Sequence, residues 1–281
     1  MAGDRRWIPD DIDPGRPSIA RIYDYALGGG HNLACDRAVF YQMLEIQPNI
    51  RELAWNNRAF MRRVVLFMVK SGVRQFLDLG SGIPTVGNVH EIAQKVDAAC
   101  RVVYVDREEV AVAHSRLLLE DDPLADMVDA DIARPDQVLG HPNAVRLLDY
   151  HQPIGLLALT VGQYIPDNRV VSVFDEYRAA LASGSMLGIS HGTDDFEDVN
   201  THTIFETAAV AGGDRMSVRT KAEILRLFGD FELVEPGLVA PSKWRPDSPP
   251  PTRAAQSGDG MWAGVGTKLS VTTAERIFPD R

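Results

Sequence analysis

The chain has 281 residues, of which 45% are hydrophobic and 24% are charged, and its formal net charge is -10. This composition is typical of a globular protein with a sizeable core, and the acidic balance disfavours nucleic acid, whose phosphates are bound through lysine and arginine. We find no signal peptide, no membrane-spanning run and no metal-ligand or disulfide spacing at Cys35 and Cys100, so we expect a cytoplasmic protein without a membrane partner.

The N-terminal quarter of the chain is predicted to be helical. After a loose arm over residues 1–17, Ser18 can cap a helix that ends at the first of three glycines, and further helices are predicted over residues 36–46 and about 51–71. We therefore expect an N-terminal arm and helical cap, residues 1–71, and a core, residues 72–281, that together form one compact unit.

Strands and helices alternate in the core. QFLDLG, RVVYVD, ADMVDAD, PIGLLALTV and SMLGISH are short apolar segments that predict five parallel strands buried on both faces. FELVEPGLV and MWAGVGTKLSV follow with no helix between them, so we expect an antiparallel hairpin across the proline-rich loop 241–260. The predicted fold is α/β: a Rossmann-like, seven-stranded sheet of the class I methyltransferase type with an N-terminal helical extension.

The first strand ends in a glycine turn, FLDLGSGIPT. Gly80 and Gly82 allow a tight turn and close backbone approach where open α/β sheets bind ligands, and the next helix N terminus is expected to offer free amides. A dinucleotide fingerprint would need glycine at Thr85. Asp78, just before the turn, suits a cation such as the amino group of S-adenosylmethionine better than a pyrophosphate.

Two more carboxylates end the second and third strands. Asp106 can accept from ribose hydroxyls, and Asp131 can accept from the adenine amino group. Ser81, Ile132 and Thr160, at the same strand ends, complete the predicted cofactor site. A helix cap at Asp106 and a surface turn at Asp131 are the alternatives, but the ordered series of strand ends favours the cofactor.

Eight segments carry a family resemblance: RIYDYALGG, NNRAFMRR, QFLDLGSGIPT, VVYVD, DADIARPDQVL, LASGSMLGISH, VEPGL and WRP. Over nearly its whole length the chain resembles the S-adenosylmethionine-dependent methyltransferase family formerly classed as a domain of unknown function. The resemblance implies a Rossmann-like methyltransferase with an added helical part. Arg107 and Glu108 depart from the family pattern, and Arg107 could stack on adenine or reach solvent. TVGQYIPD also departs from it, which leaves the shape of the acceptor pocket open.

The arm RIYDYALGGGHN is interpreted as a lid. We hypothesise that Tyr23 covers part of the cofactor, that the glycines allow close approach, and that His31 or Asn32 contacts its polar end, because the reactive sulfonium must be kept from water. Arg58 is a candidate partner for the cofactor carboxylate. The alternatives are a structural helix with a glycine C-cap and an ordinary surface arginine.

Methyl transfer needs a base only if the acceptor must lose a proton. Tyr164 and His191 are the candidates, although a wall aromatic and a strand-end histidine are the readings we favour. No motif for base amines or pyrimidine carbons follows the fourth strand, so a small-molecule or an unidentified protein acceptor remains, and we expect the small molecule. We expect specificity in residues 192–218 and in the proline-rich loop, for which a disordered spacer is the alternative.

Two other functions are compatible with parts of this pattern. A protein that binds S-adenosylmethionine or S-adenosylhomocysteine without catalysis would share the same binding residues. A nicotinamide-dependent oxidoreductase is disfavoured by Thr85 and Asp78. The pattern predicts no metal site and leaves the oligomeric state open.

Overall fold

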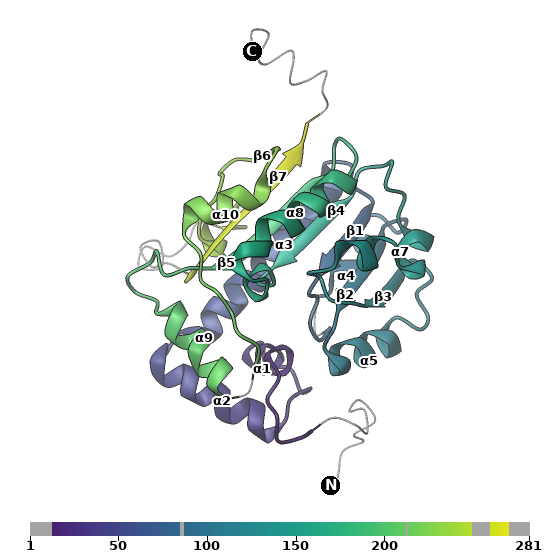
Figure 1. Ribbon diagram of the computed structural model, residues 1–281. Helices are drawn as coiled ribbons and strands as arrows, with labels where there is room; N and C mark the ends of the chain where they lie inside the picture. The colour runs from purple at the N-terminus through teal and green to yellow at the C-terminus, as the bar shows by residue number, and fades with distance from the viewer. Residues whose placement is uncertain (1–12, 85–86, 212, 249–258, 270–281) are drawn as a thin grey trace.

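A mixed sheet forms the centre of the protein in the computed structural model, which describes residues 13–84, 87–211, 213–248 and 259–269 (Figure 1). Its seven strands have the order β3-β2-β1-β4-β5-β7-β6. They are β1 (Gln75–Leu79), β2 (Arg101–Asp106), β3 (Ala125–Asp129), β4 (Gly155–Leu159), β5 (Met186–Gly192), β6 (Phe231–Leu233) and β7 (Met261–Lys268). β1 to β5 are parallel, and β7 is antiparallel to β5 and β6. The predicted fold class is confirmed.

The helices include three that the sequence did not predict. The α-helices of the described residues are α1 (Ile19–Ala26), α2 (Ala34–Ile46), α3 (Ile50–Lys70), α4 (Val89–Val96), α5 (Glu109–Leu118), α6 (Pro135–Leu139), α7 (Pro142–Leu147), α8 (Asp167–Ala180), α9 (Thr201–Val210) and α10 (Lys221–Phe228). Short 3-10 helices are η1 (Gly162–Tyr164) and η2 (Pro241–Lys243). The unpredicted helices are α6, α7 and α9. None of the described helices has the length and hydrophobicity to cross a bilayer.

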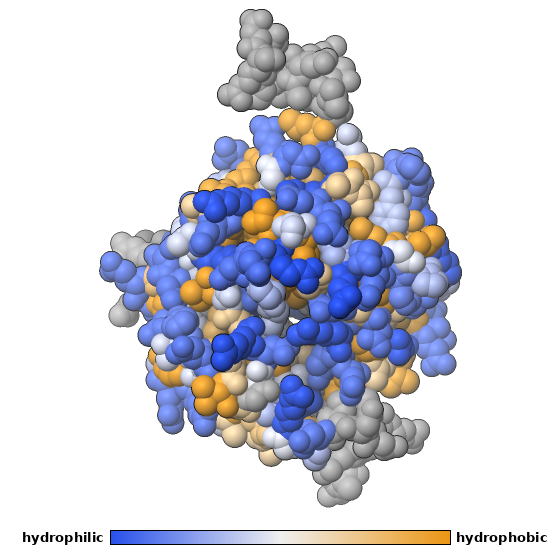
Figure 2. All heavy atoms as spheres, viewed as in Figure 1, coloured by the Kyte–Doolittle hydropathy of each residue, from blue (hydrophilic) through white to orange (hydrophobic). Residues whose placement is uncertain are grey.

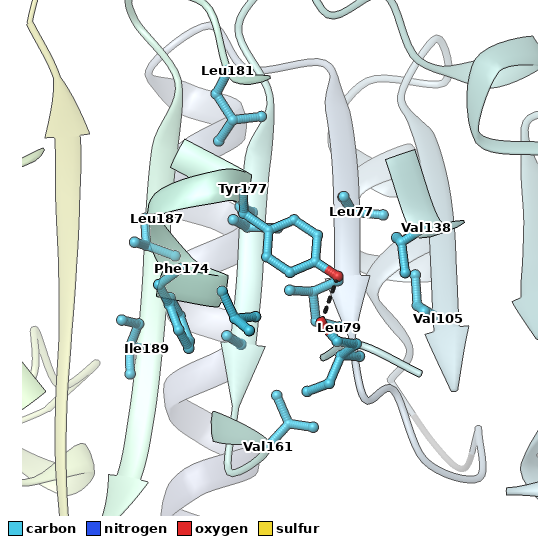
Figure 3. Packing of buried hydrophobic residues seen from close by; sticks show 14 of the residues in the cluster. Leu77, Leu79, Val105, Val138, Val161, Phe174, Tyr177, Leu181, Leu187 and Ile189 are labelled. Carbon is cyan, nitrogen blue, oxygen red and sulfur yellow. Dashed lines mark hydrogen bonds between the residues drawn. The ribbon is translucent and has the colours of Figure 1, made fainter. Parts of the chain in front are cut away.

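Alternate residues of each central strand face opposite layers. Leu77 and Leu79 of β1 pack with Phe174 and Tyr177 of α8 on one face of the sheet (Figure 3). The Tyr177 hydroxyl donates to the carbonyl oxygen of Ile132 at 2.9 Å, so even this buried phenol is satisfied. Because both faces are covered, most residues of the parallel strands are apolar, and the polar ones include Asp78 and Asp106 near the carboxyl ends of β1 and β2.

The opposite face is covered by α3, α4 and α5. Phe60, Val64 and Met68 of α3 are fully buried in this layer, beside Phe76 of β1. The N-terminal part of α3 instead contributes Leu53 to a separate cluster. One continuous helix therefore connects the sheet to the residues that overlie its edge.

That separate cluster defines the cap: α1, α2, the first turns of α3, and α9. Ile22, Phe40, Leu53 and Ile204 form its core, one from each of these helices. The cap lies at the carboxyl ends of the parallel strands (Figure 1). The part of the segment 192–218 that the structure describes includes α9 and overlies this edge as expected. Residue 212, residues 249–258 of the proline-rich loop and residues 1–12 of the arm lie outside the described residues.

Substitution of Trp244 tests the packing of the layer that α3 forms on the sheet. Its side chain is fully buried and packs edge-on against Phe60 at 5.4 Å between ring centroids. Trp244→Ala should lower the free energy of unfolding by about 3–5 kcal/mol, measured by urea denaturation. Trp55→Ala, at a tryptophan that is 53% exposed on α3, is the matched control and should change it by less than about 0.5 kcal/mol. Equal effects would contradict this packing.

Candidate active site

A cavity of about 1050 Å³ lies between the cap and the carboxyl ends of the strands. Most of the site residues predicted from the sequence line it: Tyr23, Arg58, Asp78, Gly80, Ser81, Gly82, Asp106, Arg107, Asp131, Ile132, Thr160 and Tyr164. His31, Asn32 and His191 are not among its lining residues. The strand order reverses between β1 and β4, which is where open α/β sheets place their ligands.

The glycine turn after β1 is fixed by steric and hydrogen-bond constraints. Gly80 has φ +64°, and a Cβ atom there would lie 2.0 Å from Cγ2 of Val161. Its amide donates to the carbonyl oxygen of Val105 at 2.8 Å. Gly82 also has φ +64°, and its amide donates to Oδ2 of Asp106 at 2.8 Å. The turn is thus tied to the end of β2.

The start of α4 differs from the sequence prediction, which expected free backbone amides there beside the glycine turn. A capping box of Asn88 and Glu91 satisfies amides at the start of α4, which begins only at Val89. Within the turn, the amide of Gly82 donates to a strand-end carboxylate, that of Asp106. Nη2 of Arg58 donates to Oδ1 of Asn88 at 3.3 Å, so the capping residue also orients this arginine toward the cavity wall.

Asp78 is a buried carboxyl at the end of β1. Burial raises its pKa to about 7, and the negative charge of Asp106 adds to the shift, while the positive charge of Arg58 opposes it. Such a shift means that the protein destabilises the charged form, which a bound cation would restabilise. The end of β1 is therefore suited to a ligand ammonium group.

Asp106 accepts three backbone amides. Oδ1 accepts from the amides of Arg107 at 2.8 Å and Glu108 at 3.0 Å, and Oδ2 accepts from Gly82. Burial still raises its pKa, against these three hydrogen bonds. A carboxylate offers about four acceptor positions. Asp106 can accordingly accept a ligand hydroxyl while it holds the turn.

Arg107 is held at the surface edge of the cavity. It pairs with Asp131 at 3.4 Å and with Asp214 at 2.6 Å, and all three side chains are substantially exposed to solvent. Oδ1 of Asp131 also accepts from the amide of Ala133 at 2.9 Å. Exposed pairs of this kind contribute at most about 1 kcal/mol each. They orient the polar groups beside β3 and add little stability.

Thr160 ends β4 in a strained conformation. Its φ is +54°, a left-handed value that is uncommon for a threonine. The amide is held by the carbonyl oxygen of Ser190 at 2.9 Å and by the Ser190 hydroxyl at 3.1 Å. Strain of this kind costs about 1–3 kcal/mol and persists where neighbours fix it, often at functional sites. β5 thus fixes this part of the cavity wall.

The three glycines of the arm shape a turn around Asp24. Gly28 takes φ +87° at the end of α1, and a Cβ atom on Gly29 would lie 2.0 Å from Oδ1 of Asp24. Oδ2 of Asp24 accepts from the amide of His31 at 2.8 Å and from Nδ2 of Asn32 at 3.2 Å. The close approach that the glycines permit is made to Asp24 within the arm.

Polar contacts join α1 to the core. Nε of Arg21 is 2.7 Å from Oδ2 of Asp36, both groups are buried, and Nη1 lies 3.6 Å from Oε1 of Glu108. The His31 ring packs at a tilt against His114 of α5, with centroids 4.0 Å apart. Because Glu108 adjoins the end of β2, these contacts hold α1 over the Asp106 side of the cavity.

The two candidate bases have different surroundings. His191 is fully buried; its Nδ1–H donates to the carbonyl oxygen of Gly192 at 2.9 Å, and its Nε2 accepts from Nη1 of Arg219 at 2.7 Å. Burial and the Arg219 charge lower its pKa to about 4, so the ring is neutral and fully engaged at pH 7. Tyr164 lines the cavity, but burial raises its pKa above the ordinary value. Arg219, which the sequence did not single out, is therefore the partner that fixes His191.

The fold and the strand-end carboxylates define a Rossmann-like class I methyltransferase. The chain matches the model of the family described as S-adenosyl methyltransferase over residues 5–269, and it belongs to that family. The resemblance seen in the sequence motifs is confirmed.

Two crystal structures are similar to this chain along nearly its whole length. A candidate methyltransferase from Thermobifida fusca YX has 37% identity and a TM-score of 0.87, covering 94% of this chain and 100% of that one. A DUF574 family protein from Streptomyces avermitilis MA-4680 has 34% identity and a TM-score of 0.84, covering 91% and 99%. No curated protein matches the sequence.

Asp78 should make the stability of the ligand-free protein depend on pH. Its folded-state pKa of about 7 lies above the ordinary 3.8, so its contribution to stability is greatest at low pH and is lost as pH rises through 7. Between pH 5.5 and 8, the melting temperature of Asp78→Asn should therefore fall by several degrees less than that of the wild type, as measured in calorimetric scans. Asp129→Asn, at the exposed end of β3, should retain the wild-type dependence. Identical profiles for all three proteins would contradict the assignment.

Proposed function

We propose that the protein transfers a methyl group from S-adenosylmethionine to a small-molecule acceptor and releases S-adenosylhomocysteine. The observation that carries this proposal is the pair of carboxyl groups of the buried Asp78 and the half-buried Asp106, which lie at the ends of neighbouring strands, beside a glycine turn, and line one cavity. Family membership supports it. The free thiols of Cys35 and Cys100 support a site of action in the reducing cytoplasm.

The cavity wall offers complementary groups for each part of the cofactor. In this proposal Asp78 binds the amino group and Arg58 the carboxylate of the methionine moiety. Asp106 accepts from the ribose hydroxyls, since it retains an acceptor position. The adenine lies beside Ile132, with Asp131 as acceptor for its amino group. Ser81, Gly82, Thr160 and Arg107 complete the wall.

Positioning and exclusion of water are the contributions that this chain can make to the reaction. When bound, S-adenosylmethionine supplies a methyl group that its sulfonium already activates. An acceptor lone pair forms the new bond to carbon as the carbon–sulfur bond breaks, so the protein must align the acceptor and keep water away. His191 is neutral and engaged, and Tyr164 retains its proton at neutral pH. We therefore propose that His191 positions the η1 segment through Arg219 and that neither residue is the base.

We propose that the cap acts as the lid of the site. Tyr23 of α1 lines the cavity, and its hydroxyl donates to the carbonyl oxygen of Ala54 at 3.2 Å and accepts from Nδ2 of Asn57 at 3.0 Å. The arm thus forms a wall that is hydrogen-bonded to α3. His31 and Asn32 support that wall through their contacts with Asp24.

Calorimetric titration tests the cofactor. The wild type should bind S-adenosylmethionine and S-adenosylhomocysteine in the micromolar range and should not bind NAD. Asp106→Ala should weaken both affinities at least tenfold, because the ribose loses its acceptor and the glycine turn its anchor. Asp129→Ala, at the exposed end of the neighbouring strand, is the control. No binding of either compound, or binding of NAD instead, would refute the proposal.

Substitutions of two tyrosines in α1 test whether the cap acts as a lid. Tyr23→Ala removes part of the cavity wall and should weaken S-adenosylhomocysteine binding at least tenfold. Tyr25→Ala should leave the affinity within about twofold, since Tyr25 contacts Tyr41 and Phe40 and does not line the cavity. Affinities are measured by calorimetry after both variants are shown to be folded by circular dichroism. An unchanged affinity in a folded Tyr23→Ala protein argues against the lid.

A further inference from the structure

The two sides of the cavity differ in chemistry. The strand ends contribute carboxylates and hydroxyls, whereas the cap side is mainly apolar, with Met43, Leu53, Ile204, Phe205 and Met216 among its lining residues. Charged groups on the cap side have partners: Arg21 pairs with Asp36 and Glu108, and Asp214 pairs with Arg107. The exterior contrasts with this apolar wall, since the face seen in Figure 2 is largely hydrophilic.

We infer that the acceptor is an uncharged, mainly apolar small molecule that binds between the apolar wall of the cap and the carboxyl ends of β4 and β5. This inference rests on the proposed function, because it assigns the polar strand-end side of the cavity to the cofactor. It adds the chemical class of the acceptor and the residues that select it.

The volume leaves room for two molecules. Pockets for one drug-sized ligand measure about 300–1,000 Å³, and this cavity measures about 1050 Å³. Its lining runs from Asp131 beyond β3 to Gly260 and Met261 at the start of β7. One end therefore suits a nucleoside, and the other end, under α9, suits a separate organic molecule.

Methionines are frequent among the residues that line this cavity. Met43, Met61, Met216 and Met261 line the cavity, and they are half of the eight methionines in the chain. Thioether side chains are flexible and polarisable, and they make favourable contacts with aromatic rings. Such a wall adapts to flat or branched apolar molecules.

Charge argues against an anionic acceptor. Among the described residues that line the cavity, carboxyl groups outnumber arginines nine to five, and lysine and histidine are absent. A net negative wall suits the cationic cofactor and repels a second anion. Since the apolar wall also penalises an unpaired charge of either sign, the acceptor that fits is neutral.

A matched pair of fluorescent probes tests this inference. N-phenyl-1-naphthylamine is neutral, and 8-anilinonaphthalene-1-sulfonate has the same ring system with an added anionic group. Both are titrated into the full-length protein, with and without saturating S-adenosylhomocysteine. The neutral probe should bind in both conditions with micromolar affinity, at least tenfold more tightly than the sulfonate.

Variants on and near α9 locate the bound probe. Ile204→Asp places a charge on the cavity wall and should weaken binding of the neutral probe at least tenfold. Val210→Asp, on the same helix at a residue 88% exposed, should not change it. Because Ile204→Asp could unfold the cap, Met216→Glu, at a half-buried wall residue outside the helices, provides a second test of the same prediction.

The inference is overturned if the neutral probe does not bind the S-adenosylhomocysteine-loaded protein. It is also overturned if the sulfonate binds as tightly, or if Met216→Glu and Val210→Asp bind the probe equally well. Failure to bind S-adenosylhomocysteine would count against the proposed function alone, because the probe titration without that compound tests the apolar wall independently.

Discussion

The contact between Gly80 and Val161 determines where the site opens. β1 and β4 are neighbours at the reversal of strand order, and the chain after β4 packs so closely on Gly80 that a Cβ atom would lie 2.0 Å from Val161. Only glycine meets both this constraint and the left-handed φ. The turn then brings the Gly82 amide to Asp106. The cavity lies at the carboxyl ends of β1 and β4, where the strand order reverses. The position of the candidate site thus follows from backbone geometry.

Buried charge connects the cap to this geometry. Arg21 and Asp36 form a buried pair inside the cap, and Arg21 also approaches Glu108 beside the end of β2. Removal of one member of a buried pair leaves an uncompensated charge, which costs about 3–5 kcal/mol. Asp78 is the opposite case, since burial disfavours its ionised form in the absence of a ligand. Charge pairing thus adds to the apolar core that holds the cap, whereas the candidate site retains a carboxyl group suited to a cation.

The sequence pattern of strands was enough to predict the carboxyl groups at the strand ends. Features that depend on contacts between distant segments of the chain could not be predicted in this way. Asp78, Asp106 and Asp131 could be placed together because parallel strands bring their carboxyl ends to one edge. The pairing of His191 with Arg219 joins β5 to a residue just before α10, which spacing does not reveal. Likewise α9 packs against α2, far away in the sequence, so its place in the cap had no local signal. The prolines that begin α6 and α7 were a signal that could have been used.

A crystal structure of the complex with S-adenosylhomocysteine would show whether the strand-end carboxyl groups bind the cofactor. We expect the amino nitrogen within hydrogen-bond distance of Asp78, about 2.7–3.2 Å, and a ribose hydroxyl at the same distance from Asp106. The adenine should lie beside Ile132 and Asp131, and the apolar wall formed by α3 and α9 should remain free of the nucleoside. A nucleoside bound outside this cavity, or bound within it without contact to either Asp78 or Asp106, would refute the proposed cofactor site.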